Sequence, residues 1–221
     1  MGRRIIGGAF ISLDGIVQAP GGPEEDTSGD FALGGWLANL FEETIANQVD
    51  TLLSMPFDLL LGRRTYDIFA GHWPYQPQDD PVAAMFARAR KYVLSTSDLQ
   101  AEWEGSHRLA DLDALARLKR QEGPDLVIQG SSTLYPQLLE RKLLDRLVLM
   151  TVPVTLGKGK RLFGEGTPAR TFRMVEQRIG AGGCVMSTYE PNGPPDVGSF
   201  AAQEPSEAEI ARRRRMAEGT W

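Results

Sequence analysis

The chain has 221 residues, of which 42% are hydrophobic, and a formal net charge of -5. This composition supports a hydrophobic core, and the negative charge argues against a general affinity for nucleic acid or anionic membranes. No apolar run approaches the roughly 20 residues that span a bilayer. The single cysteine, Cys184, excludes a disulfide framework and a thiolate zinc site. We therefore expect a cytoplasmic protein that holds no metal and binds neither nucleic acid nor membrane.

Apolar runs alternate with stretches of helical spacing along the chain. The predicted strands are residues 4–13, 57–62, 91–96, 124–130 and 144–154, and the predicted helices are residues 36–54, 63–69, 81–90, 111–123 and 131–143. Two loops rich in Gly, Pro and Asp are predicted at residues 14–35 and 71–81. A hairpin is predicted at residues 172–190, turning at residues 180–183.

This alternation implies crossover connections between parallel strands. We predict an α/β fold: a mostly parallel central sheet with helices on both faces and a C-terminal antiparallel hairpin. Residues 1–190 are predicted to form one domain, and residues 191–221 a flexible linker and a short basic helix that a capping box at Ser206 and Glu209 would start. We expect the arginine run at residues 212–215 to dock on its own domain or on a dimer mate rather than on nucleic acid.

The segment "GRRTY" follows the second predicted strand, and ligands of such folds sit beyond the carboxyl ends of parallel strands. Gly62 lets the backbone approach a ligand closely. The N–H groups at Arg64 and Thr65 start a helix and favour an anion, and the forked guanidinium groups of Arg63 and Arg64 suit phosphate oxygens. The pattern therefore predicts a phosphate site. The alternative is that both arginines are solvated surface residues.

Two further segments place hydroxyl groups on the same rim. In "QGSST", Gly130 ends a strand, and Ser131, Ser132 and Thr133 open a helix, where they can cap it or bind phosphate. The hydroxyls of Ser95 to Ser97 follow another strand. An ordinary N-cap would explain the first segment equally well. Taken together, the three segments predict an extended, phosphate-bearing ligand such as a dinucleotide.

These segments carry a resemblance to a known family. The matching motifs are "SLDG" at residues 12–15, "LLLGRRTY" at residues 59–66, and "LVIQGSSTLYPQLLERKLLDRLVLMTVPVTLGKGKRLF" at residues 126–163. Over roughly residues 3 to 190 the chain resembles the dihydrofolate reductase-like superfamily. It is most similar to the branch that holds the C-terminal reductase domain of the bifunctional riboflavin-biosynthesis deaminase-reductase. The resemblance implies the three-layer dihydrofolate reductase-like fold, NADPH as hydride donor, and a homodimer.

Residue by residue, the resemblance implies a cofactor site. It assigns Arg63, Arg64 and Thr65 to the 2′-phosphate and pyrophosphate, Ser95 and Thr96 to the adenosine ribose, and Val17 and Gln18 to a loop over the nicotinamide. Gly130 and Ser131 match a glycine pair beside the pyrophosphate and nicotinamide, with Ser in place of the second Gly. Gly62, Ser132, Thr133 and Leu134 complete the set. In dihydrofolate reductases the peptide bond of this glycine pair is cis. A non-proline cis bond costs about 3 kcal/mol, so the sequence does not decide whether the Gly130–Ser131 bond is cis or trans.

The catalytic and substrate-binding predictions rest on fewer signals. The resemblance places one carboxylate near the start of the first helix. Glu42 is our candidate, with a solvated helix glutamate as the alternative. Asp14 is a second candidate, although Asp-Gly is first of all a turn signal. Trp36, Phe69 and Trp73 could form an aromatic wall for a planar heterocycle or simply pack in the core.

The sequence therefore predicts an NADPH-dependent reductase of a small planar heterocycle. The closest named reaction is the reduction of 5-amino-6-(5-phosphoribosylamino)uracil in riboflavin biosynthesis, and a dihydrofolate reductase-like activity is also compatible. The alternative is a nucleotide-binding module with little turnover, either a sensor or a protein with a drifted role.

Overall fold

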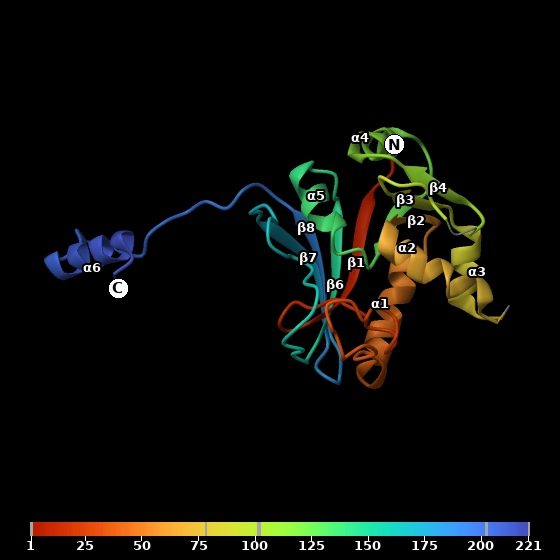
Figure 1. The fold of residues 1–221 in the computed structure, drawn as a ribbon, viewed down its shortest axis with the longest axis horizontal. Helices are drawn as coiled ribbons and strands as arrows, with labels where there is room; N and C mark the ends of the chain where they lie inside the picture. The colour runs from red at the N-terminus through yellow and green to blue at the C-terminus, as the bar shows by residue number, and fades with distance from the viewer. Residues whose placement is uncertain (1, 78, 101–102, 202, 221) are drawn as a thin grey trace.

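One sheet of eight strands forms the centre of the protein in the computed structural model, which describes residues 2–77, 79–100, 103–201 and 203–220 (Figure 1). The spatial order is β4-β3-β2-β5-β1-β6-β8-β7. The strands are β1 (Ile5–Ser12), β2 (Phe57–Gly62), β3 (Lys91–Leu94), β4 (Ser106–Leu109), β5 (Asp125–Gln129), β6 (Arg146–Val152), β7 (Phe172–Ile179) and β8 (Val185–Pro191). The helices are α1 (Glu43–Leu53), α2 (Arg63–Ala70), α3 (Pro81–Arg88), α4 (Leu112–Arg120), α5 (Leu134–Glu140) and α6 (Glu207–Glu218), with short 3-10 turns η1 (Ala38–Leu40) and η2 (Trp73–Tyr75).

The strand pairing matches the predicted fold class. Strands β4, β3, β2, β5, β1 and β6 pair in parallel, while β8 runs antiparallel to both β6 and β7. Helices α1 to α5 lie in the connections that carry the chain from β1 to β2, β2 to β3, β4 to β5 and β5 to β6, as is usual between parallel strands. The mostly parallel sheet and the C-terminal antiparallel hairpin are therefore confirmed.

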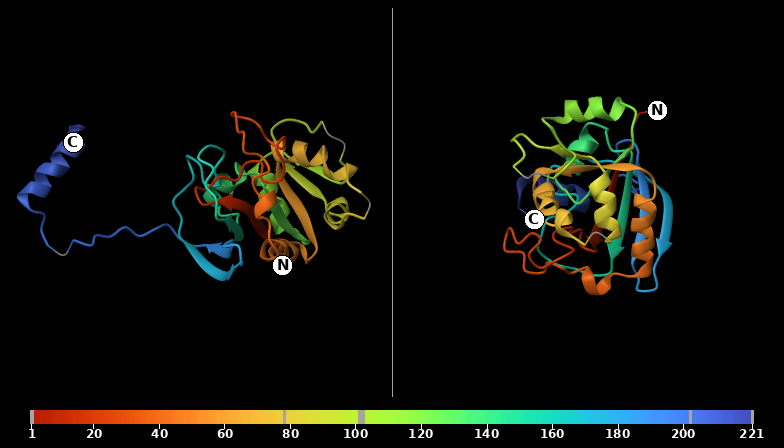
Figure 2. Two further views of the ribbon diagram at one scale, coloured as in Figure 1. Left: turned by 90° about the horizontal axis from the view of Figure 1, so that it is seen from below. Right: turned by 90° about the vertical axis from the view of Figure 1, so that its right-hand side faces the viewer.

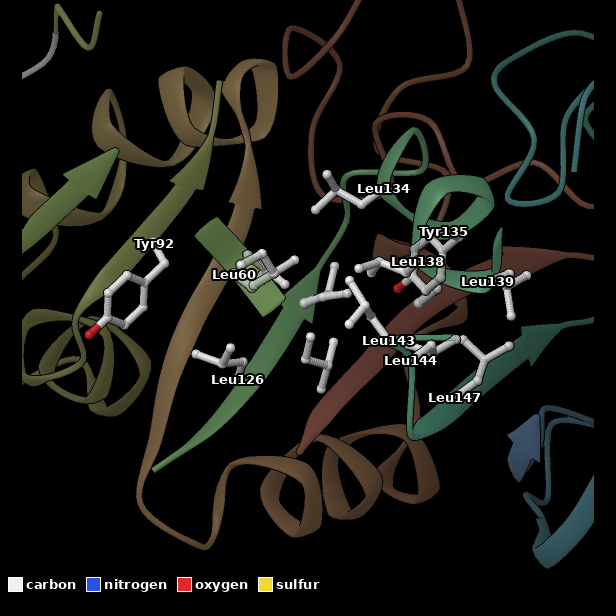
Figure 3. Close-up of a cluster of buried hydrophobic side chains, with 14 of the residues drawn as sticks. Leu60, Tyr92, Leu126, Leu134, Tyr135, Leu138, Leu139, Leu143, Leu144 and Leu147 are labelled. Atoms are coloured by element: carbon white, nitrogen blue, oxygen red, sulfur yellow. The ribbon is translucent and has the colours of Figure 1, made fainter. Parts of the chain in front are cut away.

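Helices cover both faces of the sheet and make three layers. On one face α4 and α5 pack on a core that includes Leu60 of β2 and the fully buried Tyr135 of α5 (Figure 3). On the other face α2 and α3 pack on Leu59 and Leu61, because successive strand residues point to opposite sides. Helix α1 covers β6 and β8 on that second face, with Ile45 in the core.

Two elements differ from the sequence prediction. The first helix begins at Glu43 instead of residue 36, because the chain is extended at Phe41 and Glu42 after η1. Strand β4, Ser106–Leu109, was not predicted at all. It pairs with β3 at the edge of the sheet, and only Leu109 of its four residues is buried. A strand with so little apolar character gives almost no signal in the sequence.

Beyond β8 the chain leaves the body of the protein. Helix α6 starts at Ser206, whose hydroxyl accepts a hydrogen bond from the Glu209 N–H at 3.3 Å, and ends at Gly219, which has a φ of 68°. None of its side chains is buried, and Figures 1 and 2 show it standing away from the sheet. No helix among the described residues is long and apolar enough to cross a bilayer.

Candidate functional site

A cavity of about 970 Å³ opens beside the carboxyl ends of β1, β2 and β5. Ligand sites in proteins typically measure about 300–1,000 Å³, so this cavity can hold a large ligand. Its lining comes from the loop after β1, from α1, from α2 and the segment that follows it, and from the turn after β5. It therefore lies on the rim where the sequence predicted the ligand to be.

The segment "GRRTY" lies in the wall of this cavity, where Gly62, Arg63, Arg64 and Thr65 all line it. Arg63 is already engaged: its Nε lies 2.9 Å from an Asp67 oxygen, and its Nη1 donates to the Asp98 carbonyl at 2.5 Å. Arg64 is exposed and forms no hydrogen bond or ion pair with any described residue. Because α2 begins at Arg63, the first N–H groups of this helix lack helical acceptors. Arg64 and these N–H groups can receive a phosphate.

The turn after β5 is joined directly to the start of α2. The Ser131 hydroxyl accepts a hydrogen bond from the Gly62 N–H at 2.8 Å, and the Ser131 N–H donates to the Thr65 hydroxyl at 3.1 Å. Gly130 and Ser131 both have positive φ angles, 75° and 55°, and the peptide between them is trans. The two segments thus form one rigid wall. Their cross-links use the Ser131 N–H, which is therefore not free for a ligand.

The other residues predicted around this wall divide into two groups. Ser132 and Thr133 line the cavity. Leu134 does not: its side chain is 2% exposed and belongs to the core beneath α5 (Figure 3). Ser95 and Thr96 are also absent from the lining, and the buried Ser95 hydroxyl donates to the Ser97 carbonyl at 2.8 Å. Only Ser97 of that segment reaches the wall, through a 3.2 Å hydrogen bond from Arg63.

The long loop after β1 forms the opposite wall and contributes Val17 and Gln18, as predicted. The buried Gln18 amide donates to the carbonyls of Asp26 and Ser28, both at 2.9 Å, and its oxygen accepts from the Lys160 N–H at 2.9 Å. Lys160 also forms an ion pair with Asp26. Because its polar groups are used within the protein, the Gln18 side chain shapes the loop instead of offering donors to a ligand.

Neither predicted catalytic carboxylate lines the cavity within the part of the chain that the structure describes. Asp14 accepts hydrogen bonds from the Ser12 hydroxyl at 2.6 Å and from the Leu156 and Gly157 N–H groups. These bonds lower the pKa of Asp14 to about 2, so it is ionised at neutral pH and cannot donate a proton. Asp14 therefore holds two loops together.

Glu42 lies under the β7–β8 turn. One of its oxygens accepts from the Gly182 N–H at 2.7 Å, and the other is buried without a hydrogen-bond partner. Burial, together with the Glu42 carboxylate beside it, raises the pKa of the Cys184 thiol to about 11. Glu42 lies just before α1, where the chain is extended, and it does not line the cavity.

The aromatic wall forms in part. Phe69 and Trp73 line the cavity and pack against Phe86, with ring centroids 5.9 Å and 5.0 Å from it. Trp36 does not line the cavity. Its Nε1 donates to the Gln18 carbonyl at 2.9 Å, which ties the end of the long loop to its beginning.

Many lining residues were not predicted for the site, and Glu24, Glu25 and His72 are the titratable ones among them that form no ion pair with any described residue. Burial raises the pKa of the half-buried Glu25, with a smaller contribution in the same direction from Asp26. Hydrogen bonds from the Gly21 and Gly22 N–H groups and the nearby His72 act in the opposite direction. The available signal was two neighbouring acidic residues in a long loop, since loops of that length are usually either functional or disordered. No three His, Cys, Asp or Glu side chains of the described chain come together as a metal site.

The fold is the dihydrofolate reductase-like fold. The chain matches the structure of a dihydrofolate reductase from Enterococcus faecalis complexed with NADP(H), with a TM-score of 0.53 and 17% identity over 86% of this chain and 96% of that one. A putative riboflavin biosynthesis protein from Shewanella sp. PV-4 gives a TM-score of 0.64 and 22% identity, over 87% of this chain and 99% of that chain.

The family follows from the sequence match. Residues 3–185 match the model of the RibD C-terminal domain, and the chain belongs to this family. A relative, the uncharacterized protein YyaP of Bacillus subtilis (strain 168), is 27% identical over 198 residues, which cover 86% of this chain and 96% of that protein. The whole of α6 and the segment before it lie beyond the residues that the family model matches.

Proposed function

We propose that the protein is an NADPH-dependent reductase of a small planar heterocycle. The observation that carries this proposal is the position of Arg64, an unpaired guanidinium at the start of α2 in the wall of a cavity that also holds Phe69 and Trp73. A phosphate at Arg64 and an aromatic ring near Phe69 would lie in one continuous space. NADPH is long enough to occupy both places. Arg64 would bind its 2′-phosphate, which NADH lacks, and so favour NADPH over NADH.

The residues of this chain would divide the work. When bound, the cofactor supplies the hydride. Arg64 and the first N–H groups of α2 hold its phosphates, and the cross-links between Ser131, Gly62 and Thr65 keep that wall from shifting. The loop that carries Val17 covers the cavity and limits the access of water. Since neither Asp14 nor Glu42 reaches the cavity, we infer that neither donates the proton, which would come from water admitted beside the substrate or from another group of the lining.

The first test compares NADPH and NADH in a tryptophan-fluorescence titration of the wild type, Arg64→Ala and Arg63→Ala. We expect the wild type to prefer NADPH. Arg64→Ala should weaken NADPH binding about 10- to 100-fold, the worth of a charge-assisted contact, and leave NADH binding almost unchanged. Arg63→Ala is the matched control and should change the preference less, because Asp67 already engages Arg63. Equal affinity of the wild type for both cofactors would rule the proposal out.

A second candidate function is a nucleotide-binding module that binds NADPH but catalyses little or no reduction. The absence of both predicted carboxylates from the described lining favours it. It predicts NADPH binding without NADPH oxidation in the presence of any pterin, pyrimidine or flavin precursor. Steady consumption of NADPH with one such compound would exclude it.

Two named reactions fit the reductase proposal. The family match supports reduction of 5-amino-6-(5-phosphoribosylamino)uracil, and the structural likeness to a dihydrofolate reductase supports reduction of a pterin. The first substrate carries a phosphate and the second does not, so the charge of the substrate end of the cavity discriminates between them.

We further propose a cytoplasmic homodimer. The exposed edge strand β7, with Met174 and Ile179 at its surface, supports the dimer.

A further inference from the structure

The charged side chains of the cavity mostly neutralise each other. The charged residues in the lining are Glu24, Glu25, Asp26, Arg63, Arg64, Asp67 and Lys160. Two ion pairs, Arg63 with Asp67 and Lys160 with Asp26, account for four of these charges. Arg64, Glu24 and Glu25 have no ion-pair partner among the described residues. These three set the charge that a ligand meets.

The remaining charges lie at opposite ends of one helix. Arg64 is in the first turn of α2, which ends at Ala70. Glu25 is close enough to His72, just after that end, for the two side chains to interact electrostatically. Eight helical residues span about 12 Å. The cavity therefore has the unpaired cation Arg64 at one end of α2 and the carboxyl group of Glu25 at the other.

Glu25 is held in place rather than free to swing into solvent. The side chain is half-buried, and its Oε2 accepts from the Gly21 N–H at 2.7 Å. Its own N–H donates to the Gly22 carbonyl at 3.2 Å, and the loop around it is fixed through Gln18 and Lys160. A partly buried carboxylate without an ion-pair partner is costly, and a positive group or a hydrogen-bond donor of a ligand would offset that cost.

An aromatic surface adjoins this carboxylate. His72 packs edge-on against Trp73 with ring centroids 4.9 Å apart, and Trp73 lies 5.0 Å from Phe86. Trp73, Phe86 and Phe69 all line the cavity. Aromatic faces bind flat rings, and they attract cations through their quadrupole. The Glu25 end of the cavity thus combines a surface for a planar group with a carboxylate.

We propose that the substrate is an unphosphorylated planar heterocycle that carries a positive charge or N–H donors and directs them at Glu25. This inference rests on the proposed reductase function, because it assigns the Arg64 end of the cavity to the cofactor. A phosphorylated substrate at the other end would meet the charges of Glu24 and Glu25, and Lys160, the cation of the opposite wall, is already paired with Asp26. The reduction of a phosphoribosylated uracil is therefore disfavoured.

The test uses three bicyclic aromatic probes of similar shape and different charge: the 1-methylquinolinium cation, neutral 1-naphthalenemethanol and the anion 1-naphthyl phosphate. Their affinities for the NADPH-saturated protein are measured by NMR titration. We expect the cation to bind most tightly, the neutral compound less tightly, and the anion least tightly. Glu25→Gln keeps an acceptor for the Gly21 N–H, so it should fold, and should weaken cation binding about tenfold. Glu24→Gln is the matched control, and its exposed position predicts a smaller change.

Failure of this inference and failure of the proposed function give different results. NADPH affinity is measured separately, and the probe titrations are repeated without cofactor in Arg64→Ala, where the phosphate end has lost its free cation. Loss of cofactor binding with the probe order intact would reject the reductase proposal and keep the Glu25 end of the cavity as a site for cations. Binding of 1-naphthyl phosphate as tight as that of the cation, or an unchanged affinity for the cation in Glu25→Gln, would overturn the inference.

Discussion

Ser131 shows how a single residue can stabilise the cavity wall while its own backbone is strained. Its hydroxyl accepts from the Gly62 N–H at 2.8 Å, yet its φ of 55° lies in the left-handed region that disfavours residues with a Cβ. Ser131→Ala keeps the strain and leaves a part-buried N–H without its acceptor, so we expect it to lower the free energy of unfolding by about 1–3 kcal/mol.

Ser131→Gly separates the two effects. It loses the same hydrogen bond but relieves left-handed strain of about 1–2 kcal/mol, so its loss of stability should be smaller than that of Ser131→Ala. Urea unfolding of both variants measures the difference. A glycine variant less stable than the alanine variant would show that the backbone of this turn is not strained.

Some residues predicted for the site line the cavity and others do not, and the reason is physical. Gly62 to Thr65 take their place from local order, a strand followed by a helix, so the sequence locates them on the rim. The position of a carboxylate such as Glu42 depends on the exact residue at which a helix begins, and α1 begins seven residues later than predicted. Glu25 could not be placed, because its loop is shaped by contacts with Lys160, far along the chain.

At the scale of an element, strand β1 depends on two glycines that admit neighbours from opposite faces. A Cβ on Gly7 would lie 2.5 Å from Cε1 of the fully buried Tyr135 ring, and one on Gly8 would lie 2.6 Å from Cδ2 of Leu52. We expect Gly7→Ala to cost about 1–3 kcal/mol of stability, as overpacked cores do. Gly8→Ala should cost less, since Leu52 can turn its flexible end aside.

Thermal unfolding compares these variants with Gly164→Ala, a control whose Cβ meets no atom within 4 Å. The control should stay within about 0.5 kcal/mol of the wild type. If Gly7→Ala is as stable as this control, then Tyr135 does not pack on β1 as closely as described.

Element prediction succeeded where the element carries its own apolar residues. Strand β2 is buried from Asp58 to Gly62 and stands out as an apolar run. Strand β4, Ser106–Leu109, forms through its backbone hydrogen bonds to β3, so its side chains need not be apolar. This pairing depends on the neighbouring strand, so the sequence of the short segment alone does not predict it.

For the whole molecule, the cavity is a product of long-range contacts. Gly62 meets Ser131, and Asp26 meets Lys160, across more than 60 residues in each case. The sequence could predict that such segments share a rim, because parallel strands align their carboxyl ends. It could not predict which polar groups would be consumed by one another and which, like Arg64, would remain for a ligand.

The boundary between the body and the C-terminal arm gives the last prediction. Thr171 exchanges backbone hydrogen bonds with Asn192 and Gly193, at 2.8 Å and 2.9 Å, and its hydroxyl also donates to the Gly193 carbonyl at 2.9 Å. Past that point Val197 and Phe200 are fully exposed, and α6 buries no side chain. A chain ending after Pro194 should therefore keep its Tm and its NADPH affinity.

A chain that ends after Glu190 is the matched comparison, because it also removes the partners of Thr171. We expect it to lose roughly 1–3 kcal/mol, about 2–10 °C in Tm. Differential scanning calorimetry measures both truncations, and size-exclusion chromatography records their oligomeric state. If the longer chain, ending after Pro194, already unfolds at a lower temperature, then α6 packs on the body in solution; if it also elutes as a smaller oligomer than the full chain, α6 packs on a second copy.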